Sequence, residues 1–225
     1  MGGEIWQITW FTVLAAIGAT LVMLPPGIAL AWLLARKQFP GKSLLDTVAS
    51  LPLVMPATAT GLILLYLFGR YGPIGGLLAP LGVNVVFTRV AVVLAMASMG
   101  FPLLVRTARS GFEEVRPRYE QLAATLGAGP WRIFFTVTLP LAGRTVLAGT
   151  LLALSRGIGE FGATIVIAGN IPGRTRTLAL GIFNAIEVGH DREAMLLLFV
   201  SVAIAFVLIS LSNRLIHRPA TEART

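Results

Sequence analysis

The chain has 225 residues, of which 56% are hydrophobic and 12% charged, and its mean hydropathy is +0.81. A soluble globule of this size cannot bury so much apolar surface, so the composition indicates one membrane domain over residues 1–225. Without cysteine, and with only the distant His190 and His217, no disulfide, metal site or bound cofactor is expected. The net charge of +8 lies in short basic clusters between apolar runs, which is typical of membrane proteins, so no nucleic-acid partner is predicted.

Five apolar runs are long enough to cross a bilayer as helices, which takes about 20 residues each. In chain order they are residues 8–34, 48–68, 85–105, 145–167 and 194–215. The predicted fold is therefore an all-α polytopic transmembrane helical bundle of about five spans. The apolar stretch 177–186 is too short to cross alone and is expected to form a short helix or half-span. A further span hidden in 168–193 would raise the count to six.

Prolines interrupt the first two runs. Pro25 and Pro26 lie inside the first, and Pro52 and Pro56 lie in the first turns of the second. Proline removes a backbone donor, and such breaks persist in a membrane only where protein or water satisfies the freed groups. These prolines are expected to form either hinges for inward and outward opening or static kinks.

The basic residues predict the orientation. No basic residue precedes the first run, which is too long for a cleaved signal, so it is expected to remain as a span. With five spans, twelve of the 18 lysines and arginines fall on the side of the basic cluster 36–42, and cytoplasmic loops carry such an excess. The N-terminus is therefore expected outside. The C-terminus, with Arg214, Arg218 and Arg224, is expected in the cytoplasm.

The loop at residues 106–140, between the third and fourth runs, has the most informative pattern. Pro117 suits the start of a short helix, Gly127 its C-terminal cap, and Pro130 the first turn of a second helix. The second helix carries Trp131, Phe134 and Phe135, and aromatic clusters favour protein docking surfaces. An amphipathic connector lying on lipid headgroups is the simpler alternative. Tethering to the bilayer at both ends argues against a DNA-binding helix-turn-helix.

The same loop resembles the EAA motif of ABC-importer permeases, in which Glu-Ala-Ala is followed at fixed spacing by Gly and then by Ile-x-Leu-Pro. With Gly127 as the anchor, Leu139 and Pro140 fit the motif, Val137 replaces Ile, and Gln121 replaces Glu. Glu120, one residue earlier, is a second candidate for the acidic group. The resemblance implies a cytoplasmic coupling helix that contacts an ATPase. The implied ATPase-coupling residues are Glu120, Gln121, Ala123, Gly127, Trp131, Phe134, Phe135, Leu139 and Pro140.

The runs at residues 39–61 and 155–178 resemble molybdate-type permeases of ABC importers, and sulfate permeases share much of the second run. The resemblance implies a MetI-like fold and a homodimer around a central pathway. It also implies two cytoplasmic ATPase subunits, an extracytoplasmic oxyanion-binding protein, and a setting in the lipid of a prokaryotic inner membrane. Molybdate is the first expected substrate, followed by tungstate and then by sulfate or thiosulfate.

The chain lacks the P-loop pattern Gly-x4-Gly-Lys-Ser/Thr, so it is not expected to be an enzyme, and a partner ATPase would supply the energy. Transport is expected to proceed by alternating access. A passive ion channel or a membrane sensor module is the alternative from another class.

Three polar residues are candidates for the pathway or a gate. Arg156 and Glu160 are four residues apart in the fourth run, so on a helix they share a face and can pair. They are expected either to shape the pathway or to fix this span against its neighbours. Asn170 is the third candidate, in the polar segment 168–177, where Arg174 and Arg176 are expected either to attract an anion or an acidic partner or to be solvated loop charges.

Overall fold

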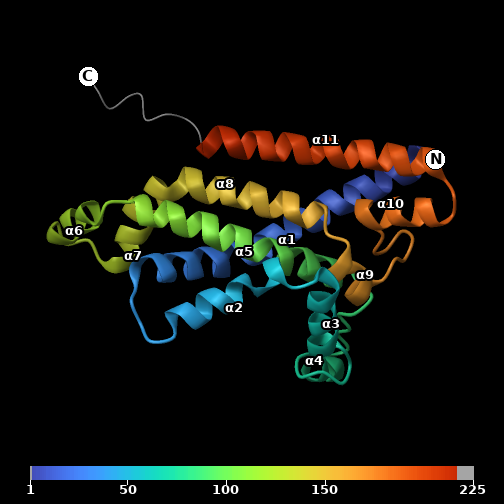
Figure 1. The fold of residues 1–225 in the computed structure, drawn as a ribbon. Helices are drawn as coiled ribbons and strands as arrows, with labels where there is room; N and C mark the ends of the chain where they lie inside the picture. The colour runs from blue at the N-terminus through green and yellow to red at the C-terminus, as the bar shows by residue number, and fades with distance from the viewer. Residues whose placement is uncertain (1, 217–225) are drawn as a thin grey trace.

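The computed structural model describes residues 2–216, and every regular element in that range is a helix (Figure 1). Four long helices form the bundle: α1 (Gly2–Arg36), α5 (Arg89–Glu114), α8 (Leu139–Ile158) and α11 (Asp191–Ile216). The shorter α-helices are α2 (Lys42–Val54), α3 (Ala57–Phe68), α4 (Gly75–Leu78), α6 (Pro117–Thr125), α7 (Pro130–Ile133), α9 (Gly162–Ala168) and α10 (Leu178–Glu187). A 3₁₀ turn, η1 (Ala79–Leu81), follows α4, and a π-helical segment, η2 (Phe134–Thr138), joins α7 to α8.

By length and composition, four helices among the described residues can cross a membrane, or five if the bent pair α2 and α3 counts as one span. This confirms the all-α membrane bundle. The predicted short helix in 177–186 is α10, with ten residues, so the six-span alternative is not supported. Arg218, Arg224 and His217 lie outside the described residues, as do the two ends of the predicted domain 1–225.

The second predicted span, 48–68, is wrong as a single helix. The structure has α2 and α3 in its place, bent by 116° at the break between them. Met55 is extended, with φ −68° and ψ 147°, and Pro56 stands before the first turn of α3. The residue before a proline is pushed out of the helical region, and proline cannot donate to the preceding turn, so the helix ends where Pro56 requires it to end.

The fourth predicted span, 145–167, is displaced. The continuous helix runs from Pro130 to Ile158 through α7, η2 and α8, and it stops at Gly159 before α9 begins at Gly162. The third span is shifted as well: α5 begins at Arg89 and extends to Glu114, so residues 106–114 of the predicted loop belong to a spanning helix.

Small residues line the interfaces between the spanning helices. Ala15, Ala16 and Ala19 of α1 are buried against Ala91 and Ala95 of α5 in the main core. Small side chains let helix backbones approach closely, which matters in a membrane because lipid offers helices no hydrophobic reason to associate.

The helix α11 covers one side of the bundle and is mostly exposed on its other face. Phe199, Val202 and Phe206 are 56–75% exposed, an apolar surface that suits lipid contact. Ser212 Oγ donates to the carbonyl of Ala148 at 3.0 Å, which ties α11 to α8.

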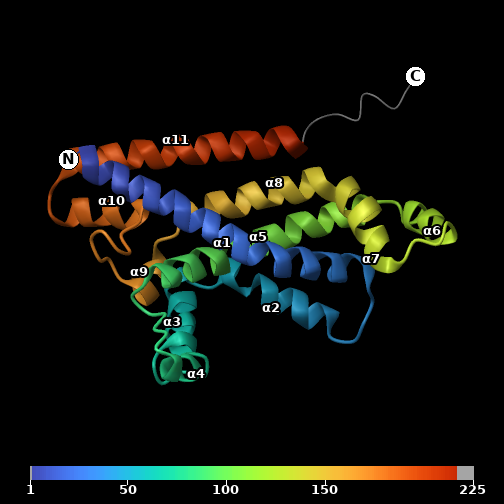
Figure 2. The same cartoon turned by 180° about the vertical axis from the view of Figure 1, so that it is seen from behind.

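The bundle has two distinct ends (Figures 1 and 2). The helix α6 lies at one end, here called the α6 end, whereas α10 and the first turns of α1 and α11 lie at the other, the α10 end. Because α11 runs back toward the α6 end, the two ends of the described chain lie at opposite ends of the bundle. This arrangement fits an odd number of crossings.

Candidate functional site

The loop between α5 and α8 has the two-helix form that the sequence predicts. Pro117 opens α6 and Pro130 opens α7. Gly127 follows α6 with φ +84°, a left-handed conformation that costs little only for glycine, and its N–H donates to the carbonyl of Ala124 at 3.0 Å. The loop therefore holds a short helix at the α6 end of the bundle through a defined turn.

Glu120 joins three elements through one carboxylate oxygen. Its Oε1 lies 3.0 Å from Nη2 of Arg36, at the end of α1, and also accepts from Arg36 Nε at 3.2 Å. The same oxygen accepts from the hydroxyl of Thr138 at 2.7 Å, in the π-helical segment. Arg36 Nη2 also donates to the carbonyl of Val115 at 2.8 Å, between α5 and α6. We call Arg36, Glu120 and Thr138 the Glu120 latch.

The latch changes the interpretation of the predicted acidic group. Glu120 is the residue that makes the polar contacts, but they are intramolecular, and its side chain is only 24% exposed. Gln121 is exposed, and Ala123 is half-buried. The sequence did not point to Arg36 as a partner, because it lies 84 residues from Glu120 in the chain.

The outward face of α6 is apolar. Tyr119, Leu122 and Leu126 are 47%, 51% and 87% exposed. Their spacing of three and four residues places them on one side of a helix. Helical periodicity alone could have predicted this face from the sequence.

The three aromatic residues of the second helix differ in their surroundings, so they do not all point outward. Phe134 packs inward: its ring centroid lies 5.8 Å from Trp32 and 6.2 Å from Phe112. Phe135 contacts Phe134 at 5.0 Å but is itself 59% exposed, and Trp131 is 78% exposed. Trp131 and Phe135 line an open groove of about 680 Å³ against α1. Their helix is continuous with a spanning helix, which turns their side chains toward α1 rather than toward the tip of the loop.

Leu139 and Pro140 begin α8 directly after the π-helical segment. Leu139 is half-buried against the cluster that includes Leu34 and Phe112, and Pro140 is exposed directly after the π-helical segment of the continuous helix. Packing of this spanning helix against the cluster therefore starts near Leu139.

Arg156 and Glu160 do pair, as predicted, at the end of α8. Nη1 of Arg156 lies 2.8 Å from Oε2 of Glu160, whose side chain is 1% exposed. The other carboxylate oxygen accepts from the backbone N–H of Ala163 at 2.7 Å, in the first turn of α9. Glu160 thus bridges the break between α8 and α9, and a carboxylate at a helix N-terminus is favourable.

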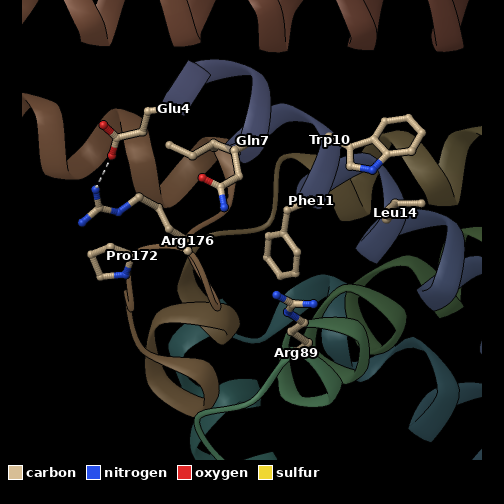
Figure 3. Close-up of a pocket in the computed structure, with 10 residues that line it drawn as sticks. Glu4, Gln7, Trp10, Phe11, Leu14, Arg89, Pro172 and Arg176 are labelled. Atoms are coloured by element: carbon tan, nitrogen blue, oxygen red, sulfur yellow. Dashed lines mark ion pairs between the residues drawn. The ribbon is translucent and has the colours of Figure 1, made fainter. Parts of the chain in front are cut away.

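Asn170 lies in the segment that leads from α9 to α10. Its Oδ1 accepts from Arg176 Nε at 3.0 Å, and Arg176 also faces Glu4, with 3.5 Å between Nη1 and Oε1. Figure 3 shows Glu4 reaching across to Arg176. Among the described residues, the hydrogen bonds of Asn170 do not involve Arg156 or Glu160, so the three predicted gate residues form two separate groups.

A family model described as "binding-protein-dependent transport system inner membrane component" matches residues 27–219. The chain belongs to this family. The matched range contains the loop between α5 and α8, the Glu120 latch and the break between α8 and α9. The chain is therefore a transport subunit of the membrane, and permeases of this family generally work with ATPase and substrate-binding partners.

Several relatives of this permease cover nearly all of the chain. The molybdenum transport system permease protein ModB of Escherichia coli K12 is 45% identical over 210 residues, which are 92% of both chains. ModB of Haemophilus influenzae is also 45% identical, over 87% of this chain and 86% of its own. The sulfate transport system permease protein CysT of Escherichia coli K12 is 37% identical, over 92% of this chain and 75% of its own.

The fold of the permease matches a chain of the MetNI methionine ABC transporter in an inward-facing conformation. The TM-score is 0.66, with 14% identity, and the match covers 96% of this chain and 94% of the other. At this identity the match concerns the fold alone, and it confirms the predicted MetI-like arrangement of helices.

Proposed function

We propose that this permease is the membrane-spanning subunit of an ATP-driven importer for a tetrahedral oxyanion, with molybdate as the first substrate. The observation that carries the proposal is the match to ModB, at 45% identity over 92% of both chains. The sulfate permease CysT is less similar, at 37%, and is covered over only 75% of its length. Tungstate shares the charge and shape of molybdate and is the next candidate, followed by sulfate and thiosulfate.

In the proposed complex, two copies of the chain surround the pathway and each α6 seats in a cytoplasmic ATPase subunit. The exposed Tyr119, Leu122 and Leu126 supply an apolar docking face, and the Glu120 latch supplies a rigid link to α1. The α10 end then faces outward, toward a binding protein that delivers the anion. This orientation places the N-terminus outside and the C-terminus in the cytoplasm of a prokaryotic cell.

The energetics require a partner of this kind. Each negative charge that enters against an inside-negative potential costs about 2.3 kcal/mol per 100 mV, and a dianion incurs this twice. The chain has no P-loop, so the nucleotide chemistry belongs to another subunit. Closure of the paired ATPases would move α6, and the permease would alternate between outward and inward openings.

The test is reconstitution of the permease with its ATPase and binding protein in proteoliposomes. ATP hydrolysis and uptake are measured with binding protein loaded with molybdate, tungstate or sulfate. The proposal expects stimulation with molybdate at least as strong as with tungstate and stronger than with sulfate. Stimulation by sulfate alone would reassign the substrate, and flux without ATP would replace the importer with a channel.

A pair of variants tests the docking face. Leu126→Glu puts a charge on the outward face of α6 and should prevent co-purification of the ATPase. Leu81→Glu is the matched control, because Leu81 is 74% exposed in η1, away from α6. Retention of the ATPase by Leu126→Glu would contradict the proposed docking site.

A further inference from the structure

A crevice opens at the α10 end between α1, the start of α5 and the segment before α10. Its volume is about 570 Å³, and we call it the Arg89 crevice. The apolar wall comes from α1, and two arginines from different elements face it. The residues that matter here are Ile8, Trp10, Phe11, Leu14, Arg89 and Arg176. Figure 3 shows Phe11 directed toward Arg89 and Arg176 directed toward Glu4.

The charges in the crevice do not cancel. Arg176 faces Glu4 at 3.5 Å and donates to Asn170 at 3.0 Å, so its charge is compensated. Arg89 forms none of the ion pairs found among residues 2–216, and its guanidinium carbon lies 5.8 Å from the centre of the Phe11 ring. The crevice therefore carries one net positive charge beside an apolar wall.

The crevice lies where tryptophans mark the edge of a bilayer. Trp6 and Trp10 stack on each other at 6.3 Å and remain 69% and 54% exposed on α1. Tryptophan is enriched at membrane–water interfaces, where its ring is partly apolar and its N–H stays hydrated. The exposed stripe continues along α1 through Leu14, Ile17 and Leu21, which points deeper into the membrane. Arg89 is exposed at this edge, so its uncompensated charge can attract an anion of the membrane surface.

We propose that the Arg89 crevice binds an anionic glycerophospholipid, with the phosphodiester on Arg89 and one acyl chain along the α1 stripe. A phosphodiester carries one negative charge, which matches the net charge of the crevice. The apolar tail matches the wall residues Trp10 and Leu14 and the exposed stripe that continues through Ile17. A small dianion would leave that wall uncovered and would overcompensate Arg89.

The site lies away from the ATPase-docking face proposed above, and its Arg176 contacts Asn170, one of the predicted pathway residues. The family match begins at residue 27, so the α1 residues of the crevice wall lie outside the matched region, whereas Arg89 and Arg176 lie inside it. The coupling loop and the Glu120 latch lie at the other end of the bundle (Figure 1). Loss of lipid binding therefore tests this site without testing the transported substrate.

Fluorescence quenching by brominated lipids reports directly on the crevice. The full chain is reconstituted in a Trp32→Phe, Trp131→Phe background, which leaves Trp6 and Trp10 as reporters at the α10 end. Brominated phosphatidylglycerol is compared with brominated phosphatidylcholine at low mole fraction. One arginine near an anionic headgroup favours the anionic lipid by about fivefold, so phosphatidylglycerol should quench at about fivefold lower mole fraction.

Substitutions then assign the preference to one residue. Arg89→Gln should abolish it, Arg89→Lys should retain most of it, and Arg174→Gln should leave it unchanged, because Arg174 is an exposed arginine that does not line the crevice. A preference that survives Arg89→Gln overturns the proposal. Absence of quenching by either lipid also overturns it, since another protein surface, such as a second copy of the chain, would then cover the stripe. Displacement of the lipid by molybdate would overturn it by assigning the crevice to the substrate.

Native mass spectrometry gives a second measurement that does not depend on the tryptophan background. The otherwise unchanged chain should retain one more phosphatidylglycerol than the Arg89→Gln variant, and the Arg174→Gln variant should match the unchanged chain. Equal lipid retention by all three would refute the site.

Discussion

The Glu120 latch makes a quantitative prediction about how α6 is held. In the Glu120→Gln variant, an amide oxygen can still accept from Thr138, but the charge that holds Arg36 is lost. The lost interaction is an ion pair, with 3.0 Å between Arg36 Nη2 and Glu120 Oε1, and a charge-assisted hydrogen bond from Arg36 Nε at 3.2 Å, between side chains that are 13% and 24% exposed. Hydrogen bonds to charged groups contribute about 1.5–3 kcal/mol, and partial exposure places the net loss here near 2 kcal/mol.

A loss of about 2 kcal/mol corresponds to about a thirtyfold shift in the equilibrium between docked and undocked α6. Hydrogen–deuterium exchange of residues 117–125 should therefore accelerate by about that factor in the purified complex. ATP hydrolysis should persist, while the amount of substrate moved per ATP falls, because α6 would no longer be fixed to α1.

Glu113→Gln is the matched control. Glu113 pairs with Arg109 four residues away on the same helix, at 2.8 Å, and its side chain is 48% exposed, so its loss should leave α6 exchange unchanged. A double-mutant cycle with Arg36→Gln isolates the latch energy. Additive effects of Glu120→Gln and Arg36→Gln would refute the reasoning, because residues that act through one contact must show coupling.

Three further predictions follow from backbone geometry and from the break after α8. Gly127→Ala should lower the stability of the loop by about 1 kcal/mol, because alanine is strained at the left-handed φ of +84°. Gly129→Ala should be nearly neutral, because Gly129 has a φ of −71°. Hydrogen–deuterium exchange of residues 117–125 measures both effects. Gly61→Ala should lower the melting temperature of the complex, since a Cβ there would lie 2.8 Å from the backbone of α9. Gly143→Ala should raise the melting temperature, because a Cβ there meets open space and alanine favours the helix over glycine. Glu160→Ala should reduce the yield of assembled complex more than Glu160→Gln, which keeps an acceptor for the first turn of α9. Normal assembly of Glu160→Gln with loss of transport would instead support a pathway role.

The long apolar helices could be predicted from composition because the membrane requires about 20 apolar residues per crossing. The helices α1 and α11 contain the whole of the predicted runs 8–34 and 194–215 and are eight and four residues longer. The end of a helix was less predictable where the apolar run continues past the last residue of the helix. The run 145–167 is apolar throughout its last part, yet the helix stops at Gly159, and Glu160 accepts from the first turn of α9.

In the candidate site, too, local features could be predicted from the sequence and long-range contacts could not. The turn at Gly127 follows from local chemistry and was predicted from the sequence. The partner of Glu120 depends on a contact across 84 residues, and the inward packing of Phe134 depends on Trp32 and Phe112. No local pattern carries that information, which is why the aromatic residues were assigned together to one docking surface.

Close packing between α5 and α8 determines how motion at α6 can reach the rest of the bundle. A Cβ at Gly100 would lie 2.8 Å from the carbonyl oxygen of Ala153, and one at Gly111 would lie 2.6 Å from Thr145. The two helices are thus in near-backbone contact at well-separated levels, and sliding one past the other would require these contacts to separate. Displacement of the loop should therefore move α5 and α8 as one rigid body, and the change in angle should concentrate where the helix ends at Gly159.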